Sequence, residues 1–302
     1  MKFLGFALLL VACHSSSSPA MGGGDDDDDQ PSPDAAVGSG GSGAVAPKIP
    51  TPTGTCPTIA NGDVTFAPAG IPPRKVKLAL DPAKSTGELV IYWFATGSAP
   101  LEAAYSLGAT ETAITDAGGV VAAPYADSDA GTFEWFIVNQ SPRLDDFILA
   151  DEIVGCLAQA GRIDPLHIHS MGMSAGALQT TAFSFLRSDY VASVATYSGG
   201  VPPQFTPTNE NPANKFAALI FDGGATDDVF GVDFQAASMA YATMLTADGH
   251  YAELCDHGKG HDIPLDAAPS VATFFTANPF GAWPSPYAAA GIPASFPSYC
   301  AR

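Results

Sequence analysis

Apolar runs of strand length alternate with amphipathic helical patterns from residue 85 onward. The run over 87–97 is apolar almost throughout, as expected for a strand that is buried on both faces. Residues 143–161 instead carry apolar side chains at helical spacing. Short connections between such segments favour a parallel sheet with helices on both faces. The sequence therefore predicts an α/β fold.

The pattern predicts the order of the elements as well as their class. Residues 58–80 are typical of an antiparallel hairpin at the sheet edge, and the tail 279–302, with five prolines, should form an irregular cover. Strands are expected at 87–97, 132–140, 165–172, 192–200, 215–224 and 251–256, and helices at 143–161, 175–188, 233–249 and 268–278.

A Gly-x-Ser-x-Gly pattern spans Gly172 to Gly176 and centres on Ser174, between an expected strand and an expected helix. A nucleophile elbow needs this context, because the sharp turn holds the serine Oγ out at the top of the sheet. The flanking glycines matter because side chains there would collide where strand and helix pack closely. A chain with 31 glycines can produce the pattern by chance, so a serine in a small-residue loop is the alternative.

A catalytic serine requires a base, and the base requires an orienting acid. In hydrolases built on such an elbow, the acid and then the histidine follow the serine along the chain. Asp227 lies on the loop after the expected strand 215–224, with Asp228 as the alternative. His261 follows the last expected strand, with His257 beside it. The expected triad is Ser174, Asp227 and His261.

The oxyanion hole of such a site combines two backbone N–H groups. One should belong to Ala175, the residue after the nucleophile, and the other to Thr96 in the loop after the strand 87–97. No histidine or cysteine spacing is typical of a metal site. We therefore expect neither a metal nor another cofactor.

The chain opens with Lys2 and a nine-residue apolar run over 3–11, which is too short to span a bilayer but suits a signal peptide. The run ends in Leu-Val-Ala-Cys, which resembles the lipobox of bacterial lipoproteins. The resemblance implies a signal peptide over 1–12 and a lipid on Cys13, and His14 after it favours the outer membrane. An ordinary secretory peptide is the alternative, and both export the protein.

Residues 13–52 are rich in Gly, Ser and Asp and contain too few apolar side chains to fold. We expect a disordered tether there and one folded domain over 53–302. Six of the 31 acidic and two of the 12 basic residues precede residue 50, which leaves 25 acids and 10 bases, a formal charge of −15. That charge disfavours nucleic acid as a partner and leaves neutral substrates open.

Four cysteines remain after Cys13. An even number in an exported chain suggests two disulfides, and four cysteines allow three connectivities. Of these we favour Cys56–Cys156 with Cys255–Cys300. The second bridge would hold the proline-rich tail near the loop that carries His261.

The segment from residue 143 to residue 180 resembles the secreted esterases that include polyhydroxybutyrate depolymerases, feruloyl esterases and acetylxylan esterases. The shared features are the pair Asp145-Asp146, Ile-Asp-Pro at 163–165 and the serine motif. Asp-Gly-Gly-Ala-Thr-Asp-Asp-Val and Gly-His-Asp-Ile-Pro are similar to the family's acid and histidine segments, which implies Asp227 and His261 for these roles. The resemblance implies an α/β-hydrolase fold.

One departure from this family lies in the oxyanion loop. The family usually has His-Gly where this chain has Phe94-Ala95. If that position needed a left-handed backbone, Ala95 would cost about 1–2 kcal/mol.

The sequence thus predicts an exported, lipid-anchored serine carboxylesterase, expected to be a monomer. Its substrates would be feruloyl or acetyl esters of polysaccharides, or polyhydroxyalkanoate oligomers. Phe280, Trp283 and Tyr287 in the tail could supply an aromatic wall or simply pack. A peptidase on the same fold is one alternative. A catalytically silent surface lipoprotein that binds glycan or polymer is the other.

Overall fold

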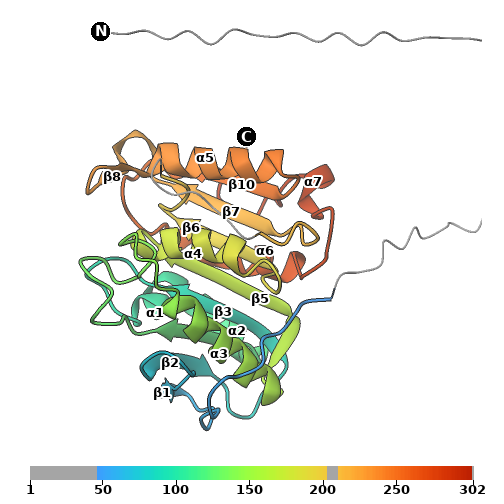
Figure 1. Ribbon diagram of the computed structural model, residues 1–302. Coiled ribbons are helices and arrows are strands. Elements are labelled where there is room, and N and C mark those ends of the chain that lie inside the picture. Colours follow the sequence, from blue (N-terminus) through green and yellow to red (C-terminus); the bar gives the residue numbers. More distant parts are fainter. Residues whose placement is uncertain (1–45, 203–209, 301–302) are drawn as a thin grey trace, which may run out of the picture. The chain divides into compact units, whose positions relative to one another are not determined.

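A mixed sheet of eight strands forms the centre of the computed structural model, in the order β1-β2-β4-β3-β5-β6-β7-β10 (Figure 1). β2 pairs antiparallel with β1 and β4, whereas neighbouring strands from β4 to β10 are parallel. The strands are β1 (Gly62–Phe66), β2 (Arg74–Leu80), β3 (Gly87–Trp93), β4 (Val120–Pro124), β5 (Ile163–Met173), β6 (Ser193–Tyr197), β7 (Ala217–Asp222) and β10 (Tyr251–Asp256).

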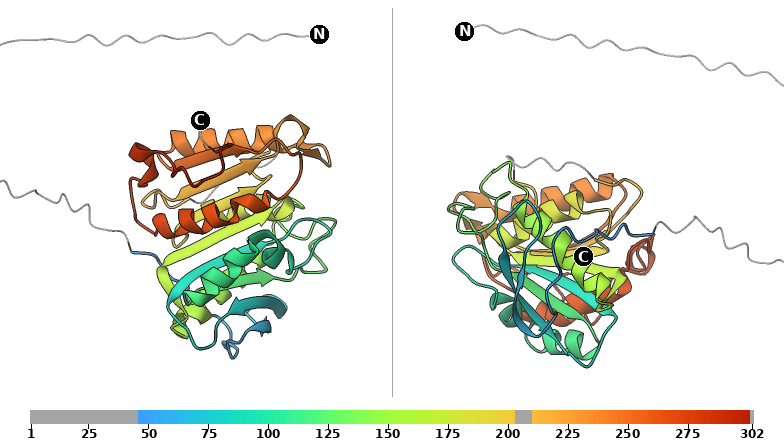
Figure 2. Two further views of the ribbon diagram at one scale, coloured as in Figure 1. Left: turned by 180° about the vertical axis from the view of Figure 1, so that it is seen from behind. Right: turned by 60° about the horizontal axis from the view of Figure 1, so that its bottom comes forward.

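Helices cover both faces of this sheet. Helices α3, α4 and α5 lie over one face (Figure 1), and the view from behind shows α2 and α6 over the other (Figure 2). A short hairpin, β8 (Asp228–Val229) and β9 (Val232–Asp233), follows β7. The helices are α1 (Glu102–Leu107), α2 (Ala109–Asp116), α3 (Asp145–Gln159), α4 (Ala175–Leu186), α5 (Phe234–Ala247), α6 (Ala268–Ala277) and α7 (Tyr287–Ala290).

The structure describes residues 46–202 and 210–300, all within the second of two units, Gly43–Arg302. The expected signal peptide 1–12, Cys13 and the expected tether as far as residue 45 lie outside the described residues. None of the helices in the described ranges is long and apolar enough to span a membrane.

The domain begins before the boundary that we expected at residue 53. Lys48 N–H donates to the Asp189 carbonyl at 2.9 Å. A Cβ on Gly155 of α3 would lie 2.7 Å from the Pro50 carbonyl oxygen, so this segment packs closely on the helix. Residues 46–52 were predicted to belong to the tether on composition, but backbone contacts hold them on the domain.

The strand predicted over 132–140 is wrong. The chain there forms turns, and Asn139 fixes them by accepting from Phe133 N–H and donating to the Trp135 carbonyl. Trp135 and Phe136 are nevertheless buried, so the apolar run signals burial and not a strand. The strand of this region is instead β4, and the short helices α1 and α2 precede it.

A buried ion cluster joins β2 to the start of α3. Arg74, 5% exposed, pairs with Asp146 at 2.5 Å and with Asp127 at 3.1 Å. Asp146 also accepts from Phe136 N–H at 2.8 Å. Because Asp146 is fully buried, its charge depends on these partners. The cluster therefore holds the loop before α3 against the sheet.

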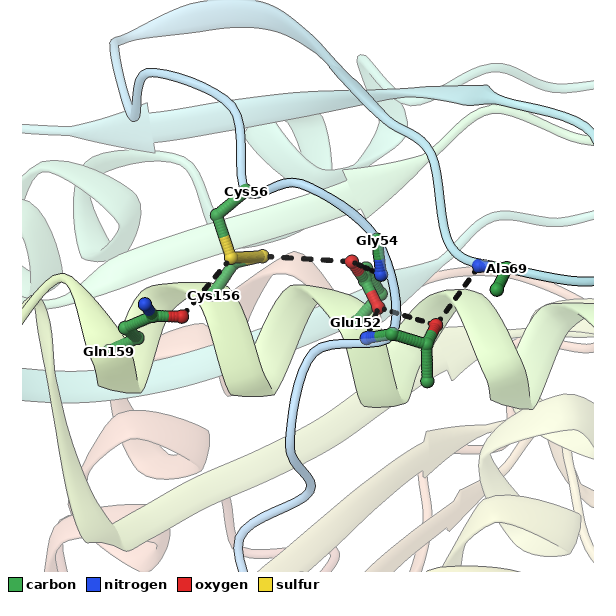
Figure 3. Close-up of a disulfide and its surroundings, with 7 residues drawn as sticks. Gly54, Cys56, Ala69, Glu152, Cys156 and Gln159 are labelled. Atoms are coloured by element: carbon green, nitrogen blue, oxygen red, sulfur yellow. Dashed lines mark hydrogen bonds between the residues drawn. A yellow bond between two sulfur atoms is a disulfide. The ribbon is translucent and has the colours of Figure 1, made fainter.

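Both favoured disulfides are present. Figure 3 shows Cys56 bonded to Cys156 of α3, near Glu152 on the same helix. The Glu152 carboxylate accepts from the N–H groups of Thr53 and Gly54 at 2.7 and 2.9 Å. The start of the domain is therefore held to α3 by a covalent bond and by charge-assisted hydrogen bonds.

The second disulfide joins Cys255 of β10 to Cys300. It ties the tail to the strand that precedes His261, as the sequence analysis anticipated. Tyr299 next to Cys300 donates to Asp266 at 3.2 Å, so the tail also contacts the loop beyond the histidine.

The substitution Arg74→Met should lower the free energy of unfolding by about 3–5 kcal/mol, because it leaves a buried carboxylate without its cation. Urea unfolding at neutral pH measures this loss. Lys48→Met is the control, since it removes an exposed pair with Asp189 and should cost less than about 1 kcal/mol. Equal losses in the two variants would contradict the role of Arg74 as the cation that stabilises a buried carboxylate.

Candidate active site

Ser174 lies on a one-residue turn between β5 and α4. β5 ends at Met173 and α4 begins at Ala175. Ser174 has φ 54° and ψ −118°, a conformation that residues with a side chain rarely adopt. Its N–H donates to the Tyr197 carbonyl of β6 at 2.9 Å. The turn therefore projects the serine from the C-terminal edge of the sheet.

The two flanking glycines allow β3 to approach this turn. A Cβ on Gly176 would lie 1.9 Å from the Trp93 carbonyl oxygen, and one on Gly172 would lie 2.4 Å from the same atom. Both contacts involve backbone, which cannot move aside. The end of β3, and with it the expected oxyanion loop, is thereby placed directly beside Ser174.

Ser174, His261 and Asp227 form a hydrogen-bonded chain. His261 Nε2 lies 2.8 Å from Ser174 Oγ, and His261 Nδ1 lies 2.7 Å from Asp227 Oδ1. A carboxylate only accepts, so Nδ1 carries the proton and Nε2 is free to accept from the serine hydroxyl. The three residues follow β5, β7 and β10, which all end at the same edge of the sheet.

Asp227 is buried, and hydrogen bonds from the protein stabilise its carboxylate. Its second oxygen, Oδ2, accepts from Ser198 Oγ–H and from Gly223 N–H, both at 2.8 Å. Burial raises the pKa of Asp227, but the hydrogen bonds from His261, Gly223 and Ser198 outweigh burial and leave the pKa below its ordinary value. The carboxylate is therefore ionised at neutral pH.

The alternative residues lie outside this chain of hydrogen bonds. Asp228 is exposed and lies opposite Asp233 in the antiparallel β8–β9 hairpin. Asp222, a further carboxylate at the end of β7, accepts from Gly224 N–H, and burial raises its pKa to about 6. His257 Nδ1 accepts from Lys259 N–H at 3.3 Å, and burial lowers the pKa of its ring.

The oxyanion loop leaves only some of its N–H groups free. Ala95 N–H donates to Glu102 Oε1 at 3.0 Å, and Gly97 N–H donates to Glu134 Oε1 at 2.8 Å. Between them, Thr96 N–H has no acceptor among the described residues, and the same holds for Ala175 N–H. These are the two donors that the sequence analysis assigned to the oxyanion hole.

The departure at Phe94-Ala95 carries no backbone strain. Ala95 is not among the residues with positive φ, whereas Gly97 has φ 78°. Glycine is therefore required two residues later than the family pattern suggested, and the chain has glycine there.

Two carboxylates that accept hydrogen bonds from this loop were not foreseen from the sequence. Glu102 also accepts from Tyr92 O–H at 3.1 Å, and burial raises its pKa. Glu134 has one buried oxygen, Oε2, without a partner among the described residues. Glu102 starts a short helix and Glu134 lies in the mispredicted segment 132–140, so no local pattern marked either one.

Phe280 and Tyr287 of the tail do not supply an aromatic wall for this site. Phe280 N–H donates to the Leu166 carbonyl at 2.8 Å, near the start of β5 and at the opposite edge from Ser174. The Tyr287 ring lies 5.9 Å from Phe274 of α6. These two side chains pack on the core. No cluster of metal-ligating side chains is present within residues 46–202 and 210–300.

No protein-family model and no curated protein matches this sequence. Solved structures match its fold. The crystal structure of native pOPH is 14% identical, with a TM-score of 0.62, and the match covers 77% of this chain and 91% of that chain. A thermostable esterase is 13% identical with a TM-score of 0.52, over 72% and 62% of the two chains.

An acylaminoacyl peptidase from Pyrococcus horikoshii is 12% identical with a TM-score of 0.53. The match covers 73% of this chain but only 42% of the peptidase. At these identities the likeness concerns the fold. The mostly parallel sheet, its helices and these neighbours show that the chain has the α/β-hydrolase fold, as predicted.

The strain at Ser174 should be measurable. Both Ser174→Gly and Ser174→Ala remove the hydroxyl, but only glycine relieves the positive φ. We expect Ser174→Gly to be more stable than Ser174→Ala by about 1 kcal/mol in thermal or urea unfolding.

The same pair of substitutions at Ser270 in α6 is the control. There alanine should be the more stable by about 1 kcal/mol, because glycine is unfavourable in a helix. If alanine were the more stable residue at both positions, Ser174 would be unstrained.

Proposed function

We propose that the protein is an exported serine hydrolase that cleaves carboxylic esters, with Ser174 as nucleophile, His261 as general base and Asp227 as the orienting acid. The single observation that carries the proposal is the chain Ser174–His261–Asp227, with contacts of 2.8 and 2.7 Å. The strained serine turn supports it independently, because such strain concentrates at functional sites.

The geometry supports a two-step reaction. Ser174 Oγ attacks the ester carbonyl while His261 Nε2 takes its proton, and Asp227 stabilises the resulting imidazolium. Thr96 and Ala175 N–H groups would bind the oxyanion, beside the positive end of the α4 dipole. His261 returns the proton to the leaving alcohol, which leaves an acyl-enzyme. Water, activated by the same histidine, then attacks it, and Ser174 regains its proton as the acid leaves.

The chemistry of the surface narrows the substrate class. The 25 acids and 10 bases after residue 50 disfavour anionic polymers. Neutral esters fit, including feruloyl or acetyl groups on polysaccharide and polyhydroxyalkanoate oligomers. We propose a monomer that reaches such polymers outside the cell.

Export is supported by the apolar leader over 3–11 and by the two disulfides, which persist in oxidising compartments. We further propose that Cys13 carries the lipid and anchors the domain to the cell envelope, in the outer membrane. Labelled palmitate should be incorporated into the wild type and not into Cys13→Ser. Equal labelling of both proteins would contradict the anchor.

Two alternatives are less well supported. A silent polymer-binding module drew its support from the altered oxyanion loop, but Ala95 carries no strain there. A peptidase is represented among the fold neighbours, yet this chain spans less than half of that enzyme.

An organophosphonate probe should label Ser174, and the folded protein should hydrolyse p-nitrophenyl acetate. Both signals should be lost in Ser174→Ala, because the nucleophile is gone. Intact-mass spectrometry and absorbance measure the two. A folded wild type that is neither labelled nor active would favour the binding module.

Asp227→Asn should lower kcat about 10³–10⁴-fold, because an amide can stabilise the wrong imidazole tautomer and cannot stabilise its cation. The exposed neighbour provides the control, and Asp228→Asn should stay within about twofold of the wild type. Comparable losses in both variants would remove Asp227 from its proposed role.

A further inference from the structure

Two phenylalanine rings meet although their loops leave the sheet far apart. The rings of Phe133 and Phe230 lie with centroids 5.7 Å apart and planes at 73°. Phe133 follows β4 and Phe230 follows β7, and these strands are separated by β3, β5 and β6. At about 4.8 Å per strand, the four spacings amount to about 19 Å. The ring pair therefore bridges the region beyond the ends of the intervening strands, the middle of which leads into Ser174.

The position of Phe230 does not favour the stability of the fold. It is 75% exposed, so it contributes little to the core. It also occupies the first position of the two-residue turn between β8 and β9, where Phe230 and Gly231 have φ of 54° and 75°. Positive φ at both positions defines a type I′ turn, which strongly prefers Asn-Gly. A bulky residue is strained there.

The hairpin that carries Phe230 is held by the catalytic groups. It begins directly after Asp227, whose carbonyl accepts from Phe234 N–H at 2.9 Å. The Phe234 ring in turn lies 4.7 Å from the ring of His261. Asp233 caps α5 by accepting from Ala236 N–H at 2.8 Å. The position of Phe230 is therefore fixed relative to the histidine.

Phe133 is held from the opposite side of the site. Its N–H donates to Asn139 Oδ1 at 3.1 Å. The adjacent Glu134 accepts from Gly97 N–H in the oxyanion loop. The pair thus connects the oxyanion side of the triad with the side of the acid and histidine.

We propose that Phe133 and Phe230 form an apolar binding surface at the rim of the active site, which receives an aryl or similarly bulky apolar group of a neutral ester. The inference rests on the proposed esterase function. Asp228 and Asp233 are exposed carboxylates of the hairpin that carries Phe230, and their charges disfavour a negatively charged group on this surface. Aromatic rings favour such a group through edge-to-face or offset contacts.

The test compares esters that differ in one group. Ethyl acetate is the reference, ethyl 3-phenylpropionate adds a ring to the acyl side, and benzyl acetate adds one to the alcohol side. Phe230→Asn removes the ring but creates the favoured Asn-Gly turn. It should lower kcat/KM at least about fivefold for one ring-bearing ester and leave ethyl acetate within about twofold. The ester affected identifies the side that binds.

The melting temperature distinguishes a binding role of Phe230 from a role in packing. The melting temperature of Phe230→Asn should stay the same or rise by a few degrees, because the turn is relieved of strain. Phe230→Tyr retains the ring and should keep the wild-type preference. Phe230→Gly, also compatible with the turn, should repeat the result of Phe230→Asn.

A wild-type enzyme that cleaves ethyl acetate, together with unchanged selectivity in Phe230→Asn and Phe230→Gly, would overturn this inference and leave the esterase proposal standing. Equal losses on all three esters, or a fall in melting temperature of several degrees in both variants, would also overturn it. A wild type that cleaves none of the esters and resists the phosphonate probe would overturn the function, and this inference with it.

Discussion

The close approach of β3 to the turn at Ser174 determines the geometry of the whole site. The carbonyl of Trp93 lies where a side chain on either flanking glycine would have to be. This contact positions the serine against the loop whose N–H groups can bind an oxyanion. It also requires the tight turn that strains Ser174, so the site depends on backbone packing before any side chain contributes.

The loop after β3 shows how acidic groups can support a site for a developing anion. Glu102 and Glu134 take up the N–H groups on either side of Thr96 and thereby fix the loop. Their negative charges oppose an oxyanion, and burial raises the pKa of Glu102. Burial therefore makes the charged form of Glu102 less favourable than it is in water.

The sequence predicted the elements whose signals are local. The glycine pattern around Ser174 and the positions of Asp227 and His261 just after strands could be recognised without long-range information. Residues 132–140 show the limit, because their apolar pattern reports burial and is compatible with turns as well as with a strand. Glu134 and the contact between Phe133 and Phe230 depend on loops from distant strands meeting, which no short pattern encodes.

The attachment of residues 46–52 has a consequence for access to the site. Lys48 is bonded to Asp189, between the end of α4 and the start of β6, at the edge of the sheet away from Ser174. Residues 46–52 therefore lie at the end of the domain opposite the proposed catalytic serine. Binding of a large substrate at the proposed catalytic rim would therefore leave the contacts of residues 46–52 with the domain intact.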